Sequence, residues 1–226
     1  MDRTTLYQLL EEYPVIPAVK NEAGLRRCAE SENPLVFVLH AALDTAGPIT
    51  ERLKACGKTV FLHMDLIDGL SQKEVAVDFL AGHTKADGIL STRPNLIRHA
   101  ASLGLLTVHR YFLLDSLSLQ NVMKSGVQDC ADLIEVLPGG MPKALRTLHA
   151  ALPMPMVAGG LIADKEDVFS ALSAGASAIS TTKEELWFLY AKRPGPAGPG
   201  RFLMRGSLRG PGFSVRISRP RRGGNG

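Results

Sequence analysis

Glycines and hydroxyl side chains gather in two short segments that each follow a predicted strand. The first segment contains Gly159 and Gly160, and the second contains Ser180 and Thr181. Glycine lets backbone N–H groups approach an anion closely, and a helix that begins directly afterwards presents an electropositive N-terminus. These four residues are therefore predicted to bind a phosphate group. The alternative is that the two glycines only form a tight turn.

Four charged residues also stand at the ends of predicted strands, namely Lys20, Asp65, Arg110 and Glu135. Lysine supplies a point charge to an anionic ligand, whereas the planar guanidinium of arginine recognises carboxylate, phosphate or hydroxyl groups. The two carboxylates can accept hydrogen bonds from ligand hydroxyls or act as an acid–base pair. The four residues are predicted to bind the remainder of a ligand. Structural ion pairs among them are the alternative.

The common metal and cofactor patterns do not occur in this sequence. His40 and His63 each end a predicted strand, but the six histidines and three cysteines form no HxxxH or CxxC pattern. His63 and Asp65 are two positions apart and are expected on one face of their strand. The His and Cys spacing therefore predicts no metal site. Because no GxGxxG motif follows the first strand and no GxxxxGK motif occurs, we also predict no nucleotide cofactor.

Eight short runs rich in β-branched and other apolar residues recur between residues 15 and 190. They lie at residues 15–19, 35–41, 59–66, 87–92, 106–112, 133–139, 154–161 and 178–181. Near-continuous hydrophobicity, rather than strict alternation, is typical of parallel strands covered on both faces. The runs are therefore predicted to form a buried parallel sheet.

Segments with helical periodicity separate these strands and follow the last one. They lie at residues 21–31, 49–57, 72–83, 94–104, 116–126, 143–152, 165–175 and 183–189. Eight consecutive βα units predict the α/β class and a (β/α)8 barrel of the TIM type. An open, doubly wound sheet is the alternative. In the barrel, the C-terminal ends of the strands form the site, and the loops after strands seven and eight usually hold phosphate.

Charge is distributed unevenly over the 226 residues. The whole chain has 26 Lys or Arg and 22 Asp or Glu, but the first 190 residues have 17 and 22, a net charge of −5. Residues 191–226 contain nine Lys or Arg, no acid, nine Gly and five Pro. We therefore predict a single barrel domain over residues 1–190 and a disordered basic tail over residues 191–226. The tail either attaches to RNA or is a non-functional extension.

Cysteine usage and hydropathy point to the cytoplasm. Cys28, Cys56 and Cys130 are an odd number at wide spacing, which fits a reducing compartment. The N-terminal residues lack the apolar run of a signal peptide, and no stretch approaches the roughly 20 apolar residues of a membrane span. A cytoplasmic protein without membrane attachment is predicted.

Five blocks of sequence, in order, resemble the glycerol-3-phosphate-responsive antiterminators, the glycerol uptake operon regulators of bacteria. The blocks are HMDLIDGLS (63–71), ADGILSTRPNLI (86–97), GLLTVHRYFLLDS (104–116), IEVLPGGMPKAL (134–145) and VAGGLIADKEDVFSALSAGASAISTTKEELW (157–187). The resemblance covers nearly all of residues 5–190. The chain departs from the family pattern at His109, where Gln is common, and at Gln72 and Lys73, where an acidic pair is common.

The resemblance implies a (β/α) barrel that binds glycerol 3-phosphate. Loaded with this ligand, the protein would act on the leader of its target messenger RNA to prevent premature termination, and it would catalyse no reaction. By position, the phosphate falls on the glycine and hydroxyl residues named above, and the glycerol falls on the four charged residues. A homodimer is left open.

An acidic barrel is a poor partner for RNA, because non-specific affinity comes from Lys and Arg that face phosphates. A local basic patch is therefore required, for which Arg93, Arg98, Lys143 and Arg146 are candidates, or a partner protein must supply the contact. For each of these four residues the alternative is an ordinary solvated helix face.

An enzyme that uses a phosphate ester is the competing class, because one barrel fold serves many chemistries. The candidates are an isomerase, an aldolase-like lyase and a glycerol-phosphate prenyltransferase. An aldolase of the Schiff-base type needs a lysine within the barrel strands, and the predicted strands between residues 35 and 181 contain none. A prenyltransferase needs an acidic metal-holding cluster, for which only Asp65 and Glu135 are offered.

Overall fold

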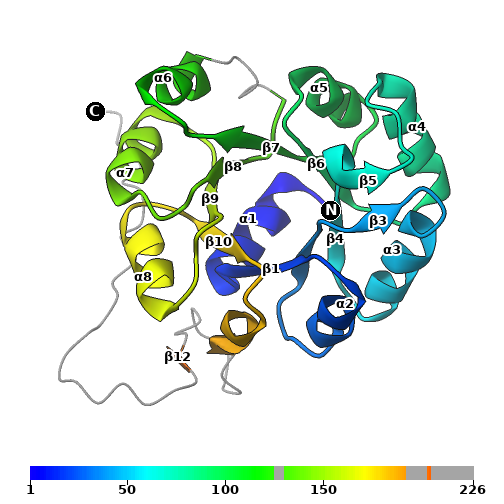
Figure 1. Cartoon of the computed structure of the whole chain (residues 1–226), viewed down its shortest axis with the longest axis horizontal. Coiled ribbons are helices and arrows are strands. Elements are labelled where there is room, and N and C mark those ends of the chain that lie inside the picture. Colours follow the sequence, from blue (N-terminus) through cyan, green and yellow to red (C-terminus); the bar gives the residue numbers. More distant parts are fainter. Residues whose placement is uncertain (125–129, 192–202, 205–226) are drawn as a thin grey trace, which may run out of the picture.

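Eight parallel strands form a closed barrel in the computed structural model, which describes residues 1–124, 130–191 and 203–204. The barrel strands are β1 (Val15–Val19), β2 (Leu35–Val38), β4 (Thr59–His63), β6 (Gly88–Ser91), β7 (Leu106–Phe112), β8 (Leu133–Leu137), β9 (Met156–Gly159) and β10 (Ala178–Thr181). The barrel closes because β1 pairs with both β2 and β10 (Figure 1). This confirms the predicted (β/α)8 barrel and excludes the open sheet.

Helices surround the strands and alternate with them along the chain (Figure 1). The surrounding helices are α2 (Glu22–Ala29), α3 (Ala46–Ala55), α4 (Glu74–His83), α5 (Pro94–Ser102), α6 (Ser116–Lys124), α7 (Pro142–Ala151) and α8 (Lys165–Ser173). Asn21 and Asp164 cap two of them by accepting a hydrogen bond from a first-turn N–H group, and prolines open α5 and α7. The last βα unit ends in a 3-10 helix, η3 (Glu184–Phe188), instead of an α-helix.

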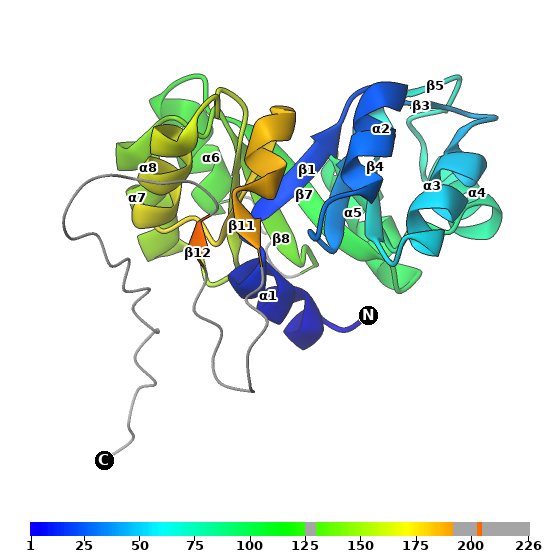
Figure 2. The same cartoon turned by 90° about the horizontal axis from the view of Figure 1, so that it is seen from below.

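An N-terminal helix, which is absent from the elements predicted above, closes the lower end of the barrel. This helix, α1 (Arg3–Glu12), lies below the strands in Figure 2. Leu6 and Leu10 share one face of the helix and are buried, while Asp2 accepts a hydrogen bond from the Thr5 N–H and caps its start. The spacing of the two leucines and the capping aspartate are signals that could have revealed this helix.

The barrel interior holds one of two hydrophobic clusters. It is built from inward-facing strand residues and the buried face of α1: Leu6, Leu10, Ile16, Leu35, Phe37, Phe61, Leu90, Leu106, Val108, Leu133, Val157 and Ala178. The second cluster fills the space between strands and helices. Residues two apart in a strand share a face, so the next inward position of several strands lies nearer the mouth. Those positions are occupied by His63, Arg110, Glu135, Gly159 and Ser180.

Two smaller sheets accompany the barrel. β3 (Ala41–Ala42) pairs in parallel with β5 (Ile67–Asp68) at the upper end of the molecule, after the 3-10 helix η1 (Met64–Leu66) (Figure 2). β11 (Tyr190–Ala191) pairs antiparallel with β12 (Leu203–Met204). These strands include three residues of the predicted tail, and the rest of the tail lies outside the described residues. The division at residue 190 therefore stays a prediction.

In the part of the chain that the structure describes, no helix is both long enough and apolar enough to cross a membrane.

Candidate functional site

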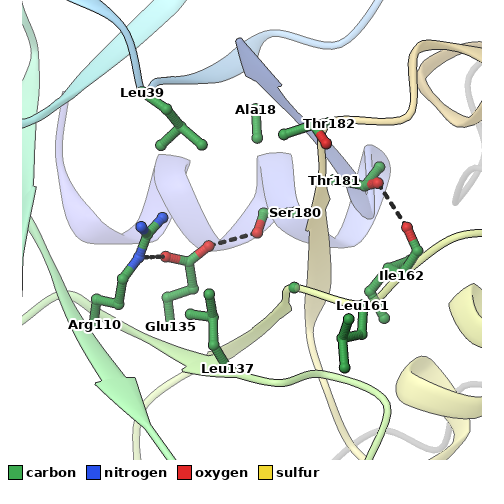
Figure 3. Close-up of a pocket in the computed structure, with 11 residues that line it drawn as sticks. Ala18, Leu39, Arg110, Glu135, Leu137, Leu161, Ile162, Ser180, Thr181 and Thr182 are labelled. Carbon is green, nitrogen blue, oxygen red and sulfur yellow. Dashed lines mark hydrogen bonds and ion pairs between the residues drawn. The ribbon is translucent and has the colours of Figure 1, made fainter. Parts of the chain in front are cut away.

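A pocket of about 200 Å³ opens at the C-terminal ends of the barrel strands. Figure 3 shows its side chains, which come mainly from β7, β8, the loop after β9, and β10. The lining residues are Ala18, Leu39, Arg110, Glu135, Leu137, Gly160, Leu161, Ile162, Ser180, Thr181 and Thr182. The pocket thus contains both predicted phosphate loops and two of the four predicted charged residues.

A chain of three polar side chains forms one wall of the pocket. Arg110 donates from Nε to one carboxylate oxygen of Glu135 at 2.6 Å, and Ser180 donates its hydroxyl to the other at 2.5 Å (Figure 3). All three side chains are buried, and Glu135 is 0% exposed. Since one positive charge faces one negative charge, the pair is compensated, and both groups can remain away from water.

The guanidinium of Arg110 has donors left over after this pairing. Its Nε serves Glu135, while its two terminal nitrogens make no hydrogen bond to any described residue. Figure 3 places that end of the side chain in the pocket, away from Glu135. Arginine presents these donors in a planar fork that matches phosphate and carboxylate oxygens. Arg110 can therefore hold an anion while it remains paired with Glu135.

Gly159 permits the close packing of this network. A Cβ at position 159 would lie 2.6 Å from the Ser180 hydroxyl oxygen and 2.7 Å from a Glu135 carboxylate oxygen. Only glycine leaves room for the Ser180–Glu135 hydrogen bond at this place. Gly159 and Ser180 therefore have a structural role, because together they hold the buried Glu135 carboxylate in place.

The loop after β9 offers backbone donors to the pocket. Gly160 has φ +68° and Leu161 has φ +55°, so the chain turns sharply here. The backbone N–H groups of Leu161, Ile162 and Thr182 donate no hydrogen bond to any described residue. Unpaired N–H groups of successive residues in such a turn bind anions well. The loop therefore presents backbone donors that can hold an anion, on the residues that follow Gly160 and Thr181.

The Thr181 hydroxyl and the N-terminus of α8 both form hydrogen bonds within the protein. The Thr181 hydroxyl donates to the Ile162 carbonyl at 2.9 Å and accepts from the Lys183 N–H. The Asp164 side chain accepts from the Asp167 N–H and thereby caps α8. The sequence predicts a helix N-terminus at the phosphate site, but the carboxylate of Asp164 caps the start of α8.

Asp65 lies elsewhere than predicted. The 3-10 helix η1 begins at Met64 and ends the strand alternation, so Asp65 does not share a face with His63. Its carboxylate accepts hydrogen bonds from the Ser91 hydroxyl and from the N–H and hydroxyl of Thr92, at 2.7 to 2.9 Å. Asp65 therefore fastens η1 to the loop after β6, and it does not line the pocket.

Lys20 does not line the pocket either. Its side chain is exposed just after β1, and it forms no ion pair with a described residue. Of the four charged residues predicted to bind the ligand, the structure therefore brings together Arg110 and Glu135 and leaves Lys20 and Asp65 outside.

His63 is a candidate that the sequence analysis left unassigned. It follows Phe61 by two positions on the inward face of β4, is 4% exposed, and finds no hydrogen-bond partner for Nδ1 among the described residues. Like Asp65 and Lys20, it does not line the pocket. Burial, and secondarily the positive charge of Arg110, lowers the pKa of His63 to about 4. The imidazole is therefore neutral near pH 7 and can accept a hydrogen bond at one ring nitrogen. The signal in the sequence was its spacing from Phe61.

Among residues 1–124 and 130–191, no group of three or more His, Cys, Asp or Glu side chains is arranged to hold a metal ion.

These features define a (β/α)8 barrel whose mouth pocket is lined by residues with hydrogen-bond donors left over. Residues 15–187 match the family described as glycerol-3-phosphate responsive antiterminators. The chain belongs to this family of regulators, as the sequence blocks predicted.

Similar proteins agree with this assignment. Over 187 residues the chain is 41% identical to a protein of Escherichia coli K12 named Uncharacterized protein YgcP, covering 83% of this chain and 98% of that protein. It also resembles the crystal structure of a glycerol uptake operon antiterminator regulatory protein from Listeria monocytogenes, with 33% identity and a TM-score of 0.72 over 76% of this chain and 94% of that one. A glycerol uptake operon antiterminator-related protein from Thermotoga maritima gives 30% identity and a TM-score of 0.68, covering 76% and 96%.

Proposed function

We propose that this chain binds glycerol 3-phosphate in the mouth pocket and, loaded with it, acts on the leader RNA of glycerol-metabolism genes in the cytoplasm to prevent premature termination. The observation that carries the proposal is the set of unpaired donors around the pocket. The terminal nitrogens of Arg110 and the N–H groups of Leu161, Ile162 and Thr182 all belong to residues that line one space of about 200 Å³.

The phosphate would lie between Arg110 and the two loops, against the backbone of Gly160 and Thr182. A phosphate ester carries up to two negative charges, and several backbone donors with one guanidinium are a common way to hold it. The glycerol hydroxyls would face Glu135, whose carboxylate lines the pocket and can accept further hydrogen bonds. Ligand binding by Gly159, Ser180 and Thr181 would be indirect, through the positions of Glu135 and the loop.

No catalytic step is part of this proposal. Both oxygens of Glu135, the carboxylate in the pocket, are already engaged by Arg110 and Ser180. Lys58 is buried just before β4, at the opposite end of that strand from the mouth, where its ammonium donates to the Ser31 and Asn33 carbonyls. A lysine bound in this way is poorly placed to form a Schiff base with a ligand at the mouth.

A route from ligand to protein surface begins at the pocket backbone. The Gly139 N–H, in the loop between β8 and α7, donates to the carbonyls of Gly159 and Gly160 at 2.6 and 3.0 Å. A ligand that fixes Gly160 would therefore also fix the loop that leads into α7. To act as a signal, the ligand must bind one conformation of this loop more tightly than another. A tenfold difference in affinity between the two conformations corresponds to about 1.4 kcal/mol.

Isothermal titration calorimetry of the full chain with glycerol 3-phosphate tests the ligand half of the proposal. Glycerol and inorganic phosphate serve as controls, and the ester is expected to bind more tightly than either. The double variant Arg110→Gln/Glu135→Gln removes both buried charges together and is expected to lose at least tenfold in affinity while it still unfolds cooperatively. Absence of binding at millimolar ester would overturn the proposal, and binding of a different phosphorylated metabolite would favour the enzyme class.

A further inference from the structure

Positive charge is concentrated on one side of the barrel wall. Residues 88–163 contain six Lys or Arg and four Asp or Glu, whereas the remainder of the first 190 residues contains eleven and eighteen. The helices α5, α6 and α7 contain no acidic residue, although each of α1, α2, α3, α4 and α8 contains at least one. Figure 1 shows these three helices following one another around the barrel. We call their outer surface the basic wall.

The basic residues of this wall are available to a partner. Arg98 on α5, Lys124 on α6, and Lys143 and Arg146 on α7 are exposed and form no ion pair with a described residue. On the opposite side, four bases form ion pairs with carboxylates, namely Arg26–Glu22, Arg27–Glu30, Arg52–Glu22 and Lys54–Asp87. The exposed Lys20, Lys73 and Lys85 on that side form no ion pair with a described residue, but 18 carboxylates accompany the eleven bases there.

Few carboxylates oppose the charge of the wall. Asp132 and Glu135 are buried and paired with Arg3 and Arg110. Asp115 is exposed just before α6, where it accepts a hydrogen bond from the Ser118 N–H. Asp129 lies outside the described residues. Within the described part of this sector, the exposed surface therefore carries one carboxylate against the four unpaired bases named above.

Exposed apolar side chains adjoin the wall where β7 leads into α6. Phe112, the last residue of β7, is 50% exposed, and Leu114, two residues further on, is 86% exposed. An exposed aromatic ring in the same sector of the barrel as unpaired Lys and Arg is suited to single-stranded nucleic acid, because bases stack on the ring while the cations face the phosphates. An acidic protein partner would also be attracted by the Lys and Arg side chains, but it has no bases that could stack on the ring.

We infer that the basic wall of α5, α6 and α7 is the surface that contacts RNA, with Arg98, Lys143 and Arg146 at the phosphates and Phe112 against a base. This inference rests on the proposed function, which supplies RNA as a partner but does not say where it binds. The loop that Gly139 fastens to the pocket continues directly into α7, so two of the proposed phosphate contacts lie on the helix nearest that loop.

The test is the salt dependence of binding to a labelled 40-nucleotide RNA that forms one hairpin, measured by fluorescence anisotropy with saturating glycerol 3-phosphate. Each lost phosphate contact lowers the slope of log K against log salt by roughly 0.7 to 0.9. For the triple variant Arg98→Gln/Lys143→Gln/Arg146→Gln, the slope of log K against log salt is therefore expected to be smaller in magnitude by about two. Its affinity for RNA at 0.1 M salt is expected to be at least tenfold lower. The matched control, Arg26→Gln/Arg27→Gln/Arg52→Gln, removes the same charge from α2 and α3 and should change the slope little.

The nine bases of residues 191–226 also attract RNA, so the comparison is repeated in a full-length background in which they are replaced by Gln. The decrease in RNA affinity and in slope caused by the wall substitutions should be the same in both backgrounds. Phe112→Ala should weaken binding severalfold with an unchanged slope, because stacking releases no counterions.

The outcomes separate this inference from the proposed function. Equal slopes for the wall variant and its control, with RNA still bound, would overturn the basic wall and leave the proposed function intact. If the unaltered chain binds no RNA, the basic wall inference and the RNA part of the proposed function are both wrong. Calorimetry with glycerol 3-phosphate tests the ligand part of the proposed function independently. A Phe112→Ala variant that keeps its RNA affinity but changes its sedimentation would assign the apolar residues to a second copy of the chain instead.

Discussion

Each oxygen of the Glu135 carboxylate is matched to one donor, and Gly159 is the residue that makes room for this arrangement. A methyl group at position 159 would overlap both the Ser180 hydroxyl and the carboxylate. Because the network is buried, displacement of either group would leave polar atoms without partners, which is costly in the protein interior.

Gly159→Ala is therefore expected to lower the free energy of unfolding by about 1 to 3 kcal/mol and to weaken ester binding. Urea denaturation followed by circular dichroism measures the first effect, and calorimetry measures the second. Gly140→Ala is the matched control, since its Cβ would meet only the Leu161 carbonyl oxygen at 3.9 Å. Equal stability of the two variants would contradict the steric role of Gly159.

His63 gives the stability of the fold a pH dependence whose direction follows from the burial of its side chain. Its pKa falls from 6.5 to about 4 on folding, mainly through burial, so the folded state resists protonation more than the unfolded state does. The resulting stabilisation is complete above pH 6.5 and is lost as the pH falls from 6.5 to 4. Over that window the free energy of unfolding should drop by on the order of 3 kcal/mol through this residue.

The substitution His63→Gln should remove this part of the pH dependence. Urea unfolding at a series of pH values, without ligand, compares the variant with the unaltered chain. His109 is also buried with a lowered pKa, but it is present in both proteins, so the difference between the two curves isolates His63. Parallel curves between pH 7 and pH 4 would show that His63 is not the group responsible.

At the scale of elements, α1 is the part of the fold that separates stability from ligand binding. It closes the barrel at the end opposite the mouth, and its buried leucines join the interior cluster of the strands (Figure 2). The pocket lies at the other end and contains no residue of α1.

Leu6→Ala is accordingly expected to destabilise the protein by about 2 to 5 kcal/mol, the range for a large-to-small change in a core. The affinity for glycerol 3-phosphate should remain within a factor of two under conditions where the variant is folded. The matched control is Gln8→Ala on the exposed face of the same helix. A large loss of affinity in Leu6→Ala, with no loss of stability, would mean that α1 acts on the site directly.

The sequence predicts the strands well because the eight apolar runs are short, regularly spaced and separated by helical segments. It predicts side-chain direction poorly, because a continuous apolar run has no alternation that would reveal the inward face. Asp65 illustrates the difficulty, since η1 turns it away from the interior just after β4 ends. The two loops that line the pocket are recognisable from glycine and strand order. The backbone N–H groups of Leu161 and Ile162, which donate to no described residue, have no side-chain signature.

At the scale of the whole molecule, the part of the mouth pocket formed by β7 and β8 lies in the same sector of the barrel as the proposed RNA surface. Arg110 on β7 and Glu135 on β8 lie in the strands that lead into α6 and α7, and the loop before α7 is fastened to the pocket backbone through Gly139. The acidic opposite side would repel RNA and so limit the ways in which it can approach. A response to ligand then needs only a local change in this sector.

Reciprocal coupling is the prediction that follows from this arrangement. If glycerol 3-phosphate raises the affinity for RNA tenfold, RNA must raise the affinity for glycerol 3-phosphate by the same factor, a coupling free energy of about 1.4 kcal/mol. Anisotropy with and without the ester gives one factor, and calorimetry with and without RNA gives the other.

The variant Arg110→Gln/Glu135→Gln is the control for this coupling, because it should keep the ligand-free affinity for RNA and lose the increase that the ester produces. The basic wall variant should behave in the opposite way and keep ester binding while it loses RNA. If the ester binds tightly but both factors equal one, the pocket is a binding site without a regulatory role, since a ligand with equal affinity for two states shifts neither.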